Sequence, residues 1–489
     1  MKKIDLNGVW QLESDWLKKK AIPANVPGDN LSALVAAKAV ADPYWGKNEL
    51  DMEFLGNTDW TYTRTVDVPA SFLDEASVYL HFDSIDTFGN VYINGKLVGK
   101  TENQFRRYRF EVKKYLVPGK NEISVSIDAS IRRSTAENKK MPYTIPYGLV
   151  EKPTYRNLIR KVQCHFGWDW GPNLPVSGFN GQVYLAAVSV ARIEYVYTAC
   201  KFVGKNCEVT VTAEVDAPQG GATMFEVSLD GQTGSKAVKL TQGLNTVSQK
   251  VVVKNVKRWW PSELGEQYRY DLSVRIGDES VEKKLGLREI EIINTEDKAG
   301  LSFTVRVNGI DIFCKGANWI PADAMPERHT REVYDDLLES ARQAHMNMIR
   351  VWGGGQYEND DFYDLCDEKG LLIWHDMMFS CALYPATKDF LANVDAEIRH
   401  QAKRLRDYAS IALWCGNNEN VGALKWFKES NENRDRYLVD YDRLNEGVIG
   451  KALDECDPTR IFWPSSPCGG RNDYSDCWHK DNRGDMHYW

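Results

Sequence analysis

The chain has 489 residues, of which 43% are hydrophobic and 27% are charged, and these values are typical of soluble globular proteins. At this length we expect about three domains. A formal net charge of −8 and a pI near 5.7 argue against nucleic-acid partners and against anionic membranes. No apolar run approaches the roughly 18 residues of a membrane helix, and no apolar segment follows Lys2 and Lys3. We therefore expect a soluble protein of the cytoplasm or periplasm, with no signal peptide in the given sequence.

Ten cysteines are spread from Cys164 to Cys477, with no Cys-x-x-Cys pair and no Cys/His cluster at zinc spacing. This pattern predicts free, mostly buried thiols in a reducing compartment, and nothing in the sequence requires a metal or an organic cofactor. The 16 tryptophans and 23 tyrosines are a surplus of aromatic residues. Such rings usually fill cores, but proteins also stack them on the apolar faces of sugars.

Residues 1–190 are predicted to form an all-β domain. Apolar residues alternate on both sides of Asn94-Gly95, and Asn-Gly between such arms is a strong hairpin signal. Further strands are expected at Val78–Phe82 and Ile123–Ile127, and one helix at about Asn30–Val40. The sum predicts a two-sheet jelly-roll.

The segment His165–Pro172 of this domain places Asp169 between Trp168 and Trp170, with glycines on both sides. Its pattern predicts neither a strand nor a helix, but a loop of fixed shape. One interpretation is a turn packed by tryptophan in which Asp169 caps its own backbone. The other is a loop that contributes a carboxylate and an aromatic wall to a pocket elsewhere.

Residues 191–296 are predicted to form a second β domain with more regular strands. Between Cys207 and Val215, apolar residues alternate with Glu and Thr, which is the period of a half-buried strand. Similar runs recur at Met224–Leu229, Val247–Val253, Tyr268–Ile276 and Leu287–Ile293. About seven short strands in about 100 residues are typical of an immunoglobulin-like sandwich.

Residues 297–489 alternate predicted strands with predicted helices. The expected strands are Phe313–Gly316, Met348–Trp352, Leu371–Asp376, the run that begins at Ile411, and Ile461–Pro464. The first helix should pack through Val333, Leu337, Ala341 and Ala344. Repeated βα units indicate a parallel sheet, and because no Gly-rich phosphate loop follows a strand, a (β/α)₈ TIM barrel is favoured over a doubly wound sheet. Fewer than the roughly 250 residues of a complete barrel remain, so we expect an incomplete barrel of about strands 1–6.

Polar and aromatic side chains gather at the ends of these strands. In a barrel, the strand carboxyl ends converge on one mouth. The residues expected there are Lys315, Asn318, Trp319, Arg350, Trp352, His375, Asp376, Asn418 and Glu419. Any one could be structural: Arg350 could be the buried partner of a carboxylate, and His375 a core histidine. Together they predict a carbohydrate site, since sugars need hydrogen bonds at their edges and an aromatic plane at their face.

Glycoside hydrolysis normally uses two carboxylates that flank the scissile bond. Glu419 is the candidate general acid, because an adjacent apolar wall and a second carboxylate would raise its pKa toward the working pH. The later glutamates Glu429, Glu432, Glu446 and Glu455 all lie in helical or polar surroundings. By this test the second carboxylate is not in the sequence.

Several segments are similar in order and spacing to the β-mannosidases of glycoside hydrolase family 2, and the resemblance covers the whole chain. The most specific are Gly167–Pro172 (Gly-Trp-Asp-Trp-Gly-Pro) and Trp414–Glu419 (Trp-Cys-Gly-Asn-Asn-Glu). The others are Val26–Asp29, Asp42–Glu49, Gly316–Pro321, Arg350–Gly355 and Gly484–Trp489. The resemblance implies a sugar-binding jelly-roll, an immunoglobulin-like domain and a catalytic barrel. It also implies a retaining exo-hydrolase that removes β-D-mannose from non-reducing ends.

The resemblance also implies roles for individual residues. Glu419 matches the acid/base, Asn418 the amide at the sugar 2-hydroxyl, and Arg350 the arginine that holds the nucleophile. Trp352 matches a wall of the sugar subsite, and Trp426 a further substrate-facing tryptophan. Asp169, beside Trp168, matches a carboxylate that enters the pocket from outside the barrel.

The nucleophile of the family, a glutamate in a Ser-Glu-Tyr-like segment, is not expected within these 489 residues, so the chain alone is predicted to be inactive. Two alternatives stay open. One is another exo-glycosidase of the same architecture, acting on β-galactosides or β-glucuronides, and the other is a non-catalytic carbohydrate-binding protein. The sequence does not predict an oligomeric state.

Overall fold

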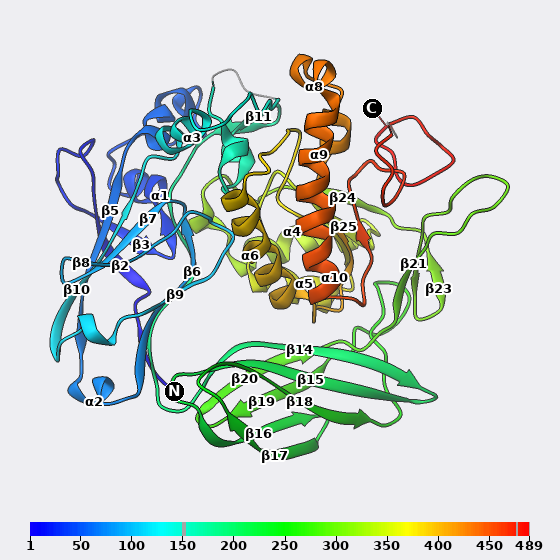
Figure 1. Ribbon diagram of the computed structural model, residues 1–489, viewed down its shortest axis with the longest axis horizontal. Coiled ribbons are helices and arrows are strands. Elements are labelled where there is room, and N and C mark those ends of the chain that lie inside the picture. The colour runs from blue at the N-terminus through cyan, green and yellow to red at the C-terminus, as the bar shows by residue number, and fades with distance from the viewer. Residues whose placement is uncertain (149–152, 476–477, 489) are drawn as a thin grey trace.

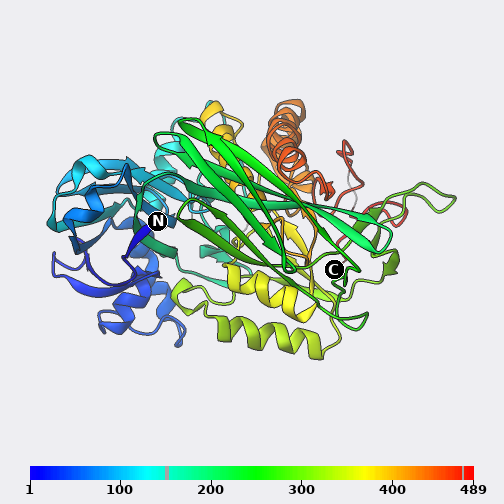
Figure 2. The same ribbon diagram turned by 90° about the horizontal axis from the view of Figure 1, so that it is seen from below.

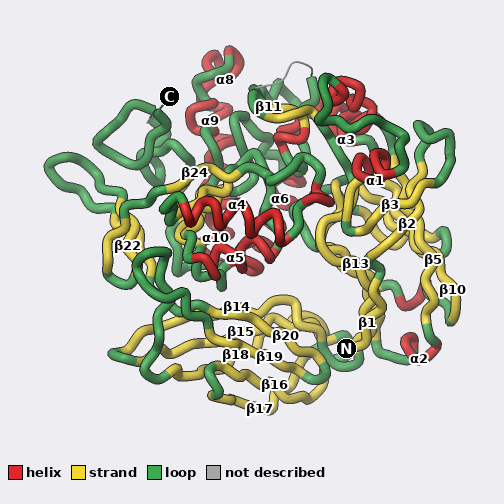
Figure 3. The backbone as a smooth tube through the Cα atoms, turned by 180° about the vertical axis from the view of Figure 1, so that it is seen from behind, coloured by secondary structure: helices red, strands yellow, loops and turns green. Residues whose placement is uncertain are grey.

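The computed structural model describes residues 1–148, 153–475 and 478–488. Two β-rich parts, blue to cyan and green in Figure 1, flank a third part in which helices surround a sheet. Seen from below in Figure 2, the green sandwich crosses in front of the other two parts. Figure 3 shows that the larger helices are gathered in the third part, whereas the other two consist mainly of strands. The predicted multi-domain β-rich architecture is confirmed.

The N-terminal part is a sandwich of two antiparallel sheets around one core. The first sheet has the order β1-β13-β6-β9, with β4 also paired to β13, and the second has the order β3-β2-β5-β10-β7-β8. Side chains of both sheets, such as Trp10, Leu80 and Val125, are buried in the same cluster. The strands are β1 (Lys2–Asp5), β2 (Gly8–Glu13), β3 (Ile22–Val26), β4 (Gly28–Asp29), β5 (Trp60–Val68), β6 (Ser77–Asp86), β7 (Gly89–Ile93), β8 (Lys96–Lys100), β9 (Tyr108–Glu111), β10 (Gly119–Ile127) and β13 (Gly178–Val188).

The hairpin predicted around Asn94-Gly95 is confirmed. It joins β7 to β8, and both turn residues have positive φ, 51° and 74°, which is the geometry that Asn-Gly supplies at little cost. The expected early helix is α1 (Asn30–Ala36), whose cap Asp29 accepts a hydrogen bond from the Ser32 N–H at 2.8 Å. The other helices of this part are α2 (Ala70–Leu73), α3 (Ser130–Asn138) and the 3₁₀ turns η1 (Asn48–Asn57), η2 (Lys113–Tyr115), η3 (Arg156–Leu158) and η4 (Gln163–His165).

The segment around Asp169 differs from its prediction. It was expected to contain no strand, but it forms a small antiparallel hairpin of β11 (Phe166–Trp168) and β12 (Gly171–Asn173). Asp169 and Trp170 are the two residues of its turn. Gly167, with φ of 89°, adopts backbone geometry that strands rarely contain, and this explains why the alternation typical of a strand is missing from the sequence.

The second part is a sandwich of seven strands, as predicted. One sheet has the order β14-β15-β18 and the other β17-β16-β19-β20, and their facing sides share one core. The strands are β14 (Arg192–Val203), β15 (Asn206–Ala217), β16 (Gly221–Leu229), β17 (Gln232–Leu240), β18 (Gly243–Val253), β19 (Tyr270–Ile276) and β20 (Glu279–Leu285).

The segment Leu287–Ile293, predicted as a strand of this sandwich, pairs elsewhere. Its strand β21 (Ile290–Ile293) joins β22 (Thr304–Val307) and β23 (Ile310–Ile312) in a separate three-stranded sheet. This small sheet buries Val305, Val307 and Ile312 against Leu372 and Ala412 of the third part. The sequence shows the alternation of a strand but not its partner, which is why the pairing was wrong.

The third part contains a parallel sheet whose strands lie in sequence order. They are β24 (Gly316–Trp319), β25 (Met348–Val351), β26 (Leu372–Asp376), β27 (Ile411–Cys415) and β28 (Phe462–Trp463). The sheet is open between β24 and β28, and no closed barrel forms among the described residues. The predicted barrel is therefore not confirmed, and five parallel strands form where about six were expected.

The helices of this part connect the strands and cover the sheet. They are η5 (Pro326–Arg328), α4 (Arg331–Gln343), α5 (Asp360–Lys369), α6 (Lys388–Leu405), α7 (Asn420–Ala423), α8 (Lys428–Glu432), α9 (Arg434–Leu444), η6 (Asn445–Gly450) and α10 (Lys451–Cys456). The stripe predicted for α4 is wrong: Val333 and Leu337 are 38% and 41% exposed, and the helix packs through Tyr334 and Leu338. None of the described helices is both long enough and apolar enough to cross a membrane.

Candidate active site

The ends of three neighbouring strands define the candidate site. Beyond β26, β27 and β28 the parallel pairing continues as isolated bridges from Ser380 to Asn418 and from Asn418 to Ser466. The main chain therefore stays extended just long enough to carry polar residues past the buried strands. Asn418 and Glu419 lie at this edge, as the sequence predicted for residues that directly follow an apolar run.

Glu419 is held in place by its backbone and by both carboxylate oxygens. Its φ of 67° is uncommon for a non-glycine residue, and its N–H donates to the Ser466 carbonyl at 2.8 Å. The Cys381 thiol donates to Oε2 at 3.1 Å, and His487 Nδ1 lies 2.8 Å from Oε1. With 8% of its surface exposed, Glu419 is a buried carboxylate that still reaches solvent.

Cys381 keeps its proton in this arrangement. Burial first, and then the negative charge of Glu419, raise the pKa of the thiol to about 12. The thiol is therefore a neutral donor at ordinary pH, and it fixes one of the two oxygens of Glu419.

Asn418 is oriented by a buried ion pair. Arg350 contacts both oxygens of Asp376, at 2.7 and 3.3 Å, and its Nη2 also donates to Asn418 Oδ1 at 2.9 Å. Burial opposes the charge of Arg350, but the attraction of Asp376 outweighs it and raises the arginine pKa. The Asn418 amide nitrogen donates to Ser380 Oγ at 3.1 Å, so both ends of this amide have fixed partners. Arg350 is thus the partner of a carboxylate, which was one of its two predicted interpretations.

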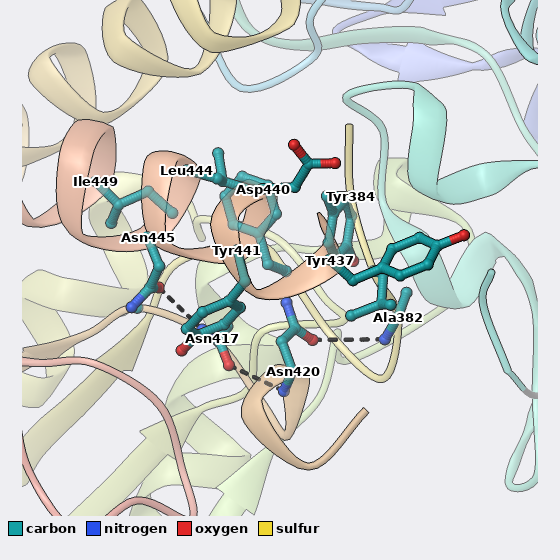
Figure 4. Close-up of a pocket in the computed structure, with 13 residues that line it drawn as sticks. Ala382, Tyr384, Asn417, Asn420, Tyr437, Asp440, Tyr441, Leu444, Asn445 and Ile449 are labelled. Carbon is teal, nitrogen blue, oxygen red and sulfur yellow. Dashed lines mark hydrogen bonds between the residues drawn. The ribbon is translucent and has the colours of Figure 1, made fainter. Parts of the chain in front are cut away.

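The neighbouring amide Asn417 has a different surrounding. Its side chain donates to Asn445 and to the Pro464 carbonyl and accepts from Ser465 and from the Asn420 N–H, at 2.6–3.1 Å. Figure 4 shows this group facing a cavity beneath α9. The cavity holds only about 10 Å³, the space of one water molecule, so it is too small for a sugar. Asn417 therefore supports the loop, whereas Asn418 points to the opposite side, as alternate residues of an extended chain do.

The hairpin of the N-terminal domain lies against the end of β25. The ring of Trp352 is 4.8 Å from that of Trp168 and 5.5 Å from that of Trp170, edge to face in both cases. The guanidinium of Arg156 also lies over the Trp168 ring, 4.6 Å from its centre. Asp169 at the turn is exposed and makes no hydrogen bond or ion pair with any described residue. The interpretation of a turn that caps itself is therefore not supported, and the carboxylate is available to a ligand.

The turn after β25 also approaches the strand of Glu419 closely. A side chain at Gly353 would come within 2.5 Å of the Phe379 carbonyl and 3.3 Å of the Asn418 nitrogen. Only glycine allows the two main-chain segments to approach this closely. The close approach brings Trp352 beside the Asn418–Glu419 edge.

Trp426 is connected to Glu419 through two other rings. Its ring is 42% exposed and is 6.2 Å from that of Trp478, which in turn is 5.4 Å from the imidazole of His487. A row of three rings therefore leads from Trp426 to the residue that contacts Glu419.

Lys315 and His375, which were expected at the mouth, are not there. Lys315 precedes β24 rather than ending it, because the strand begins at Gly316, and its Nζ lies 3.5 Å from Glu263 on the surface. His375 is fully buried and lies between the Tyr363 hydroxyl and the Asp376 carbonyl, each at 2.8 Å. Burial lowers the pKa of His375 to about 3, so this residue is a neutral core histidine.

The sequence did not assign roles to Cys381, Ser466, Asp485 or His487. Asp485 and His487 belong to a segment that carried the family resemblance, but no function was attached to them. A weak signal for Ser466 was its place directly after a strand, which is where Asn418 and Glu419 also occur. All nine described cysteines are free, and no group of three or more His, Cys, Asp or Glu among the described residues could hold a metal ion.

Two stretches of the chain match known protein-family models. Residues 10–181 match the family description "Glycosyl hydrolase 2 galactose-binding domain-like", and residues 191–288 match "Glycosyl hydrolases family 2". The chain belongs to glycosyl hydrolase family 2. A β-mannosidase of Bos taurus is 35% identical over 99% of this chain, and a β-mannosidase B of Emericella nidulans is 33% identical over 97%. The chain spans 58% and 57% of the lengths of these relatives.

Two solved structures extend the comparison. The β-D-mannosidase from Dictyoglomus thermophilum is similar with a TM-score of 0.92 at 35% identity, covering 100% of this chain and 60% of its own. A structure of the exo-β-D-glucosaminidase CsxA is similar with a TM-score of 0.73 at 18% identity, covering 95% of this chain and 53% of its own. At this low identity the second likeness shows only a shared fold.

Proposed function

We propose that the chain carries the acid/base and sugar-binding groups of a retaining exo-β-mannosidase. The observation that carries the proposal is Glu419, a buried carboxylate at a strand end with one amide neighbour fixed by Arg350. Its support is the similarity to β-mannosidases over nearly the whole chain. Within this proposal the α/β part is the N-terminal portion of a catalytic (β/α)₈ barrel, and the winding of β24–β28 in sequence order is consistent with it.

In the first half of the proposed reaction, Glu419 donates its proton to the glycosidic oxygen while a second carboxylate attacks the anomeric carbon. In the second half Glu419 takes a proton from water, which then attacks the same carbon, so the configuration is retained. Asn418 is proposed to hydrogen-bond the sugar 2-hydroxyl. Its orientation is already set by Arg350 and Ser380, so little ordering is needed when a sugar binds.

Substrate recognition is proposed to use the aromatic wall and the exposed carboxylate of the hairpin. Trp352 and Trp168 supply ring surface for the apolar face of a mannose, and Asp169 accepts hydrogen bonds from its hydroxyls. Trp426 would contact the sugar or the leaving group at the outer side. All of these assignments rest on the resemblance and on the positions described above.

The second carboxylate is proposed to come from polypeptide outside these 489 residues. A retaining enzyme needs it about 5–5.5 Å from the first. Arg350, which the resemblance pairs with the nucleophile, is paired with Asp376.

The test is a panel of aryl β-glycosides offered to the full-length gene product and to the 489-residue chain. We expect the full-length protein to release the aryl alcohol from the β-D-mannoside much faster than from the β-galactoside or β-glucuronide. The 489-residue chain should release none. Turnover by the short chain would refute the proposal about the second carboxylate, and a preference for another sugar would refute the substrate.

A second candidate function is non-catalytic carbohydrate binding. It is favoured by one observation only: the carboxylate that Arg350 contacts among the described residues is Asp376, not a glutamate nucleophile. It predicts saturable sugar binding without turnover in the full-length protein, and the same panel distinguishes it.

A further inference from the structure

Behind Glu419 a row of hydrogen bonds leads into the protein. His487 Nδ1 is 2.8 Å from Glu419 Oε1, and the other ring nitrogen, Nε2, is 3.0 Å from Ser466 Oγ. Ser466 Oγ is in turn 2.6 Å from Asp485 Oδ2. Four side chains from three separate segments therefore make three consecutive contacts, with a carboxylate at each end.

Each of these three contacts needs one proton. A neutral imidazole supplies one and the Ser466 hydroxyl supplies another, so two protons are present if both carboxylates are ionised. One contact would then bring two bare acceptors together, which is unfavourable. A row in which all three contacts are hydrogen bonds must hold one additional proton.

The additional proton can occupy three positions in the row, and all three contacts are hydrogen bonds in each case. It can sit on Glu419, which then donates to Nδ1, or on His487, which then donates from both nitrogens. It can also sit on Asp485, which then donates to Ser466. The three arrangements have the same total charge and differ only by proton shifts along the existing hydrogen bonds.

The surroundings of Asp485 permit it to hold this proton. Its Oδ1 accepts from Trp463 Nε1 at 2.7 Å and from the Cys468 N–H at 3.0 Å, which leaves Oδ2 facing Ser466. Burial raises the pKa of Asp485, although its hydrogen bonds and the charges of Arg350 and His487 act in the opposite direction. At the other end, Glu419 Oε2 faces the neutral Cys381 thiol, while Oε1 faces the row.

We propose that Glu419, His487, Ser466 and Asp485 form a relay that shares one proton between the two carboxylates. The transfer starts from the arrangement in which Asp485 holds the additional proton. The Asp485 proton passes to Ser466 Oγ, the Ser466 proton passes to Nε2, and the Nδ1 proton passes to Glu419 Oε1, which makes Glu419 a proton donor. No proton is gained or lost in this transfer. Resting on the proposed function, the relay would supply the proton that Glu419 donates to the glycosidic oxygen in the first half of the reaction. The proton that Glu419 takes from water in the second half would restore the row. His487, Ser466 and Asp485 act as positioning residues.

The test is the ¹⁵N resonance pattern of His487 in the 489-residue chain, which does not depend on any sugar or on turnover. In Asp485→Asn the amide oxygen should keep the two donors Trp463 and Cys468, so the amide nitrogen faces Ser466 and donates. Ser466 must then donate to Nε2, and His487 is fixed with its proton on Nδ1. We expect the Nδ1 resonance to move toward that of a protonated nitrogen and the Nε2 resonance toward that of a bare one.

A second pair of variants tests whether the effect passes through Ser466. In Ser466→Ala the row is cut, so adding Asp485→Asn should produce no further change at His487, whereas Ser466→Thr should retain the wild-type pattern. The resonances of His375, fixed in the core by Tyr363 and Asp376, report correct folding in every variant. Identical His487 patterns in wild type and Asp485→Asn, or an undiminished Asp485→Asn effect in the Ser466→Ala background, would overturn the relay. Failure of the β-mannoside assay would leave this result unaffected.

Discussion

Two buried polar regions of the protein, the seam between the N-terminal domain and α6 and the edge that carries Glu419, differ in how completely their groups are paired. In the seam, Arg160 and Glu397 are 1% and 0% exposed, and two parallel hydrogen bonds of 2.7 and 2.8 Å join them. Glu397 accepts two more, from Tyr357 at 3.0 Å and from Asn103 at 2.9 Å. The carboxylate has no capacity left for a ligand.

At the Glu419 edge the pairing of polar groups is incomplete on the side that faces solvent. Glu419 still reaches solvent, Asp169 has no partner among the described residues, and Trp170 and Trp426 are 46% and 42% exposed. Burial alone does not distinguish a site from a scaffold. What distinguishes them is whether polar and aromatic groups remain available to a ligand once the hydrogen bonds and ring contacts within the protein have formed.

The largest expected effect is in the seam. Glu397→Ala removes one partner and leaves the Arg160 charge buried, so we expect the free energy of unfolding to fall by about 3–5 kcal/mol. Chemical denaturation of both proteins measures this. Lys428→Ala, at an exposed pair with a spacing of 3.8 Å, is the control and should change stability by less than about 0.5 kcal/mol. Equal losses of unfolding free energy in the two variants would contradict the conclusion that Arg160 and Glu397 form a buried, fully paired ion pair.

The second effect, which is smaller for each unit of pH, is expected from the neutral core histidine. The pKa of His375 is lowered to about 3 by burial, against about 6.5 in an unfolded chain. Between these values the unfolded chain binds a proton that the folded chain does not. The free energy of unfolding should therefore fall as the pH decreases from about 6.5 toward 3, by up to about 1.4 kcal/mol per pH unit.

The contribution of His375 is the difference in slope between wild type and His375→Gln, measured by denaturation at several pH values. Other buried histidines, such as His81, whose pKa is lowered to about 4, contribute to both proteins alike. A wild-type slope no steeper than that of the variant would contradict the assignment of His375 to the core.

The sequence predicted features that depend on neighbouring residues, but it did not predict features that depend on residues far apart in the chain. The strand that ends at Glu419 was predictable, because a short apolar run followed by polar residues is a local pattern. The face of α4 was not, because Val333 and Leu337 stay near the surface and the partner surface selects Tyr334 and Leu338 instead. Nor was the contact of Glu419 with His487, since 68 residues separate them and loop packing brings them together.

The smallest expected effect on stability is at the hairpin turn. Because Asp169 is exposed and unpaired among the described residues, Asp169→Asn should change the free energy of unfolding by less than about 0.5 kcal/mol. The same substitution should clearly weaken mannose binding, measured by calorimetry, if the carboxylate accepts sugar hydroxyls. A loss of stability without a loss of mannose binding would show that Asp169 has a structural role and not a role in binding.

The central proposal is that Glu419 is the proton donor of a β-mannosidase. The most direct measurement compares leaving groups in the full-length protein and its Glu419→Gln variant. A donor matters most when the leaving group needs a proton. The variant should therefore lose about 10²–10⁴-fold in kcat/KM on an unactivated β-mannoside. It should lose far less in the first step on one with an acidic aryl leaving group. Equal losses on both substrates, or no loss on either, would contradict the claim.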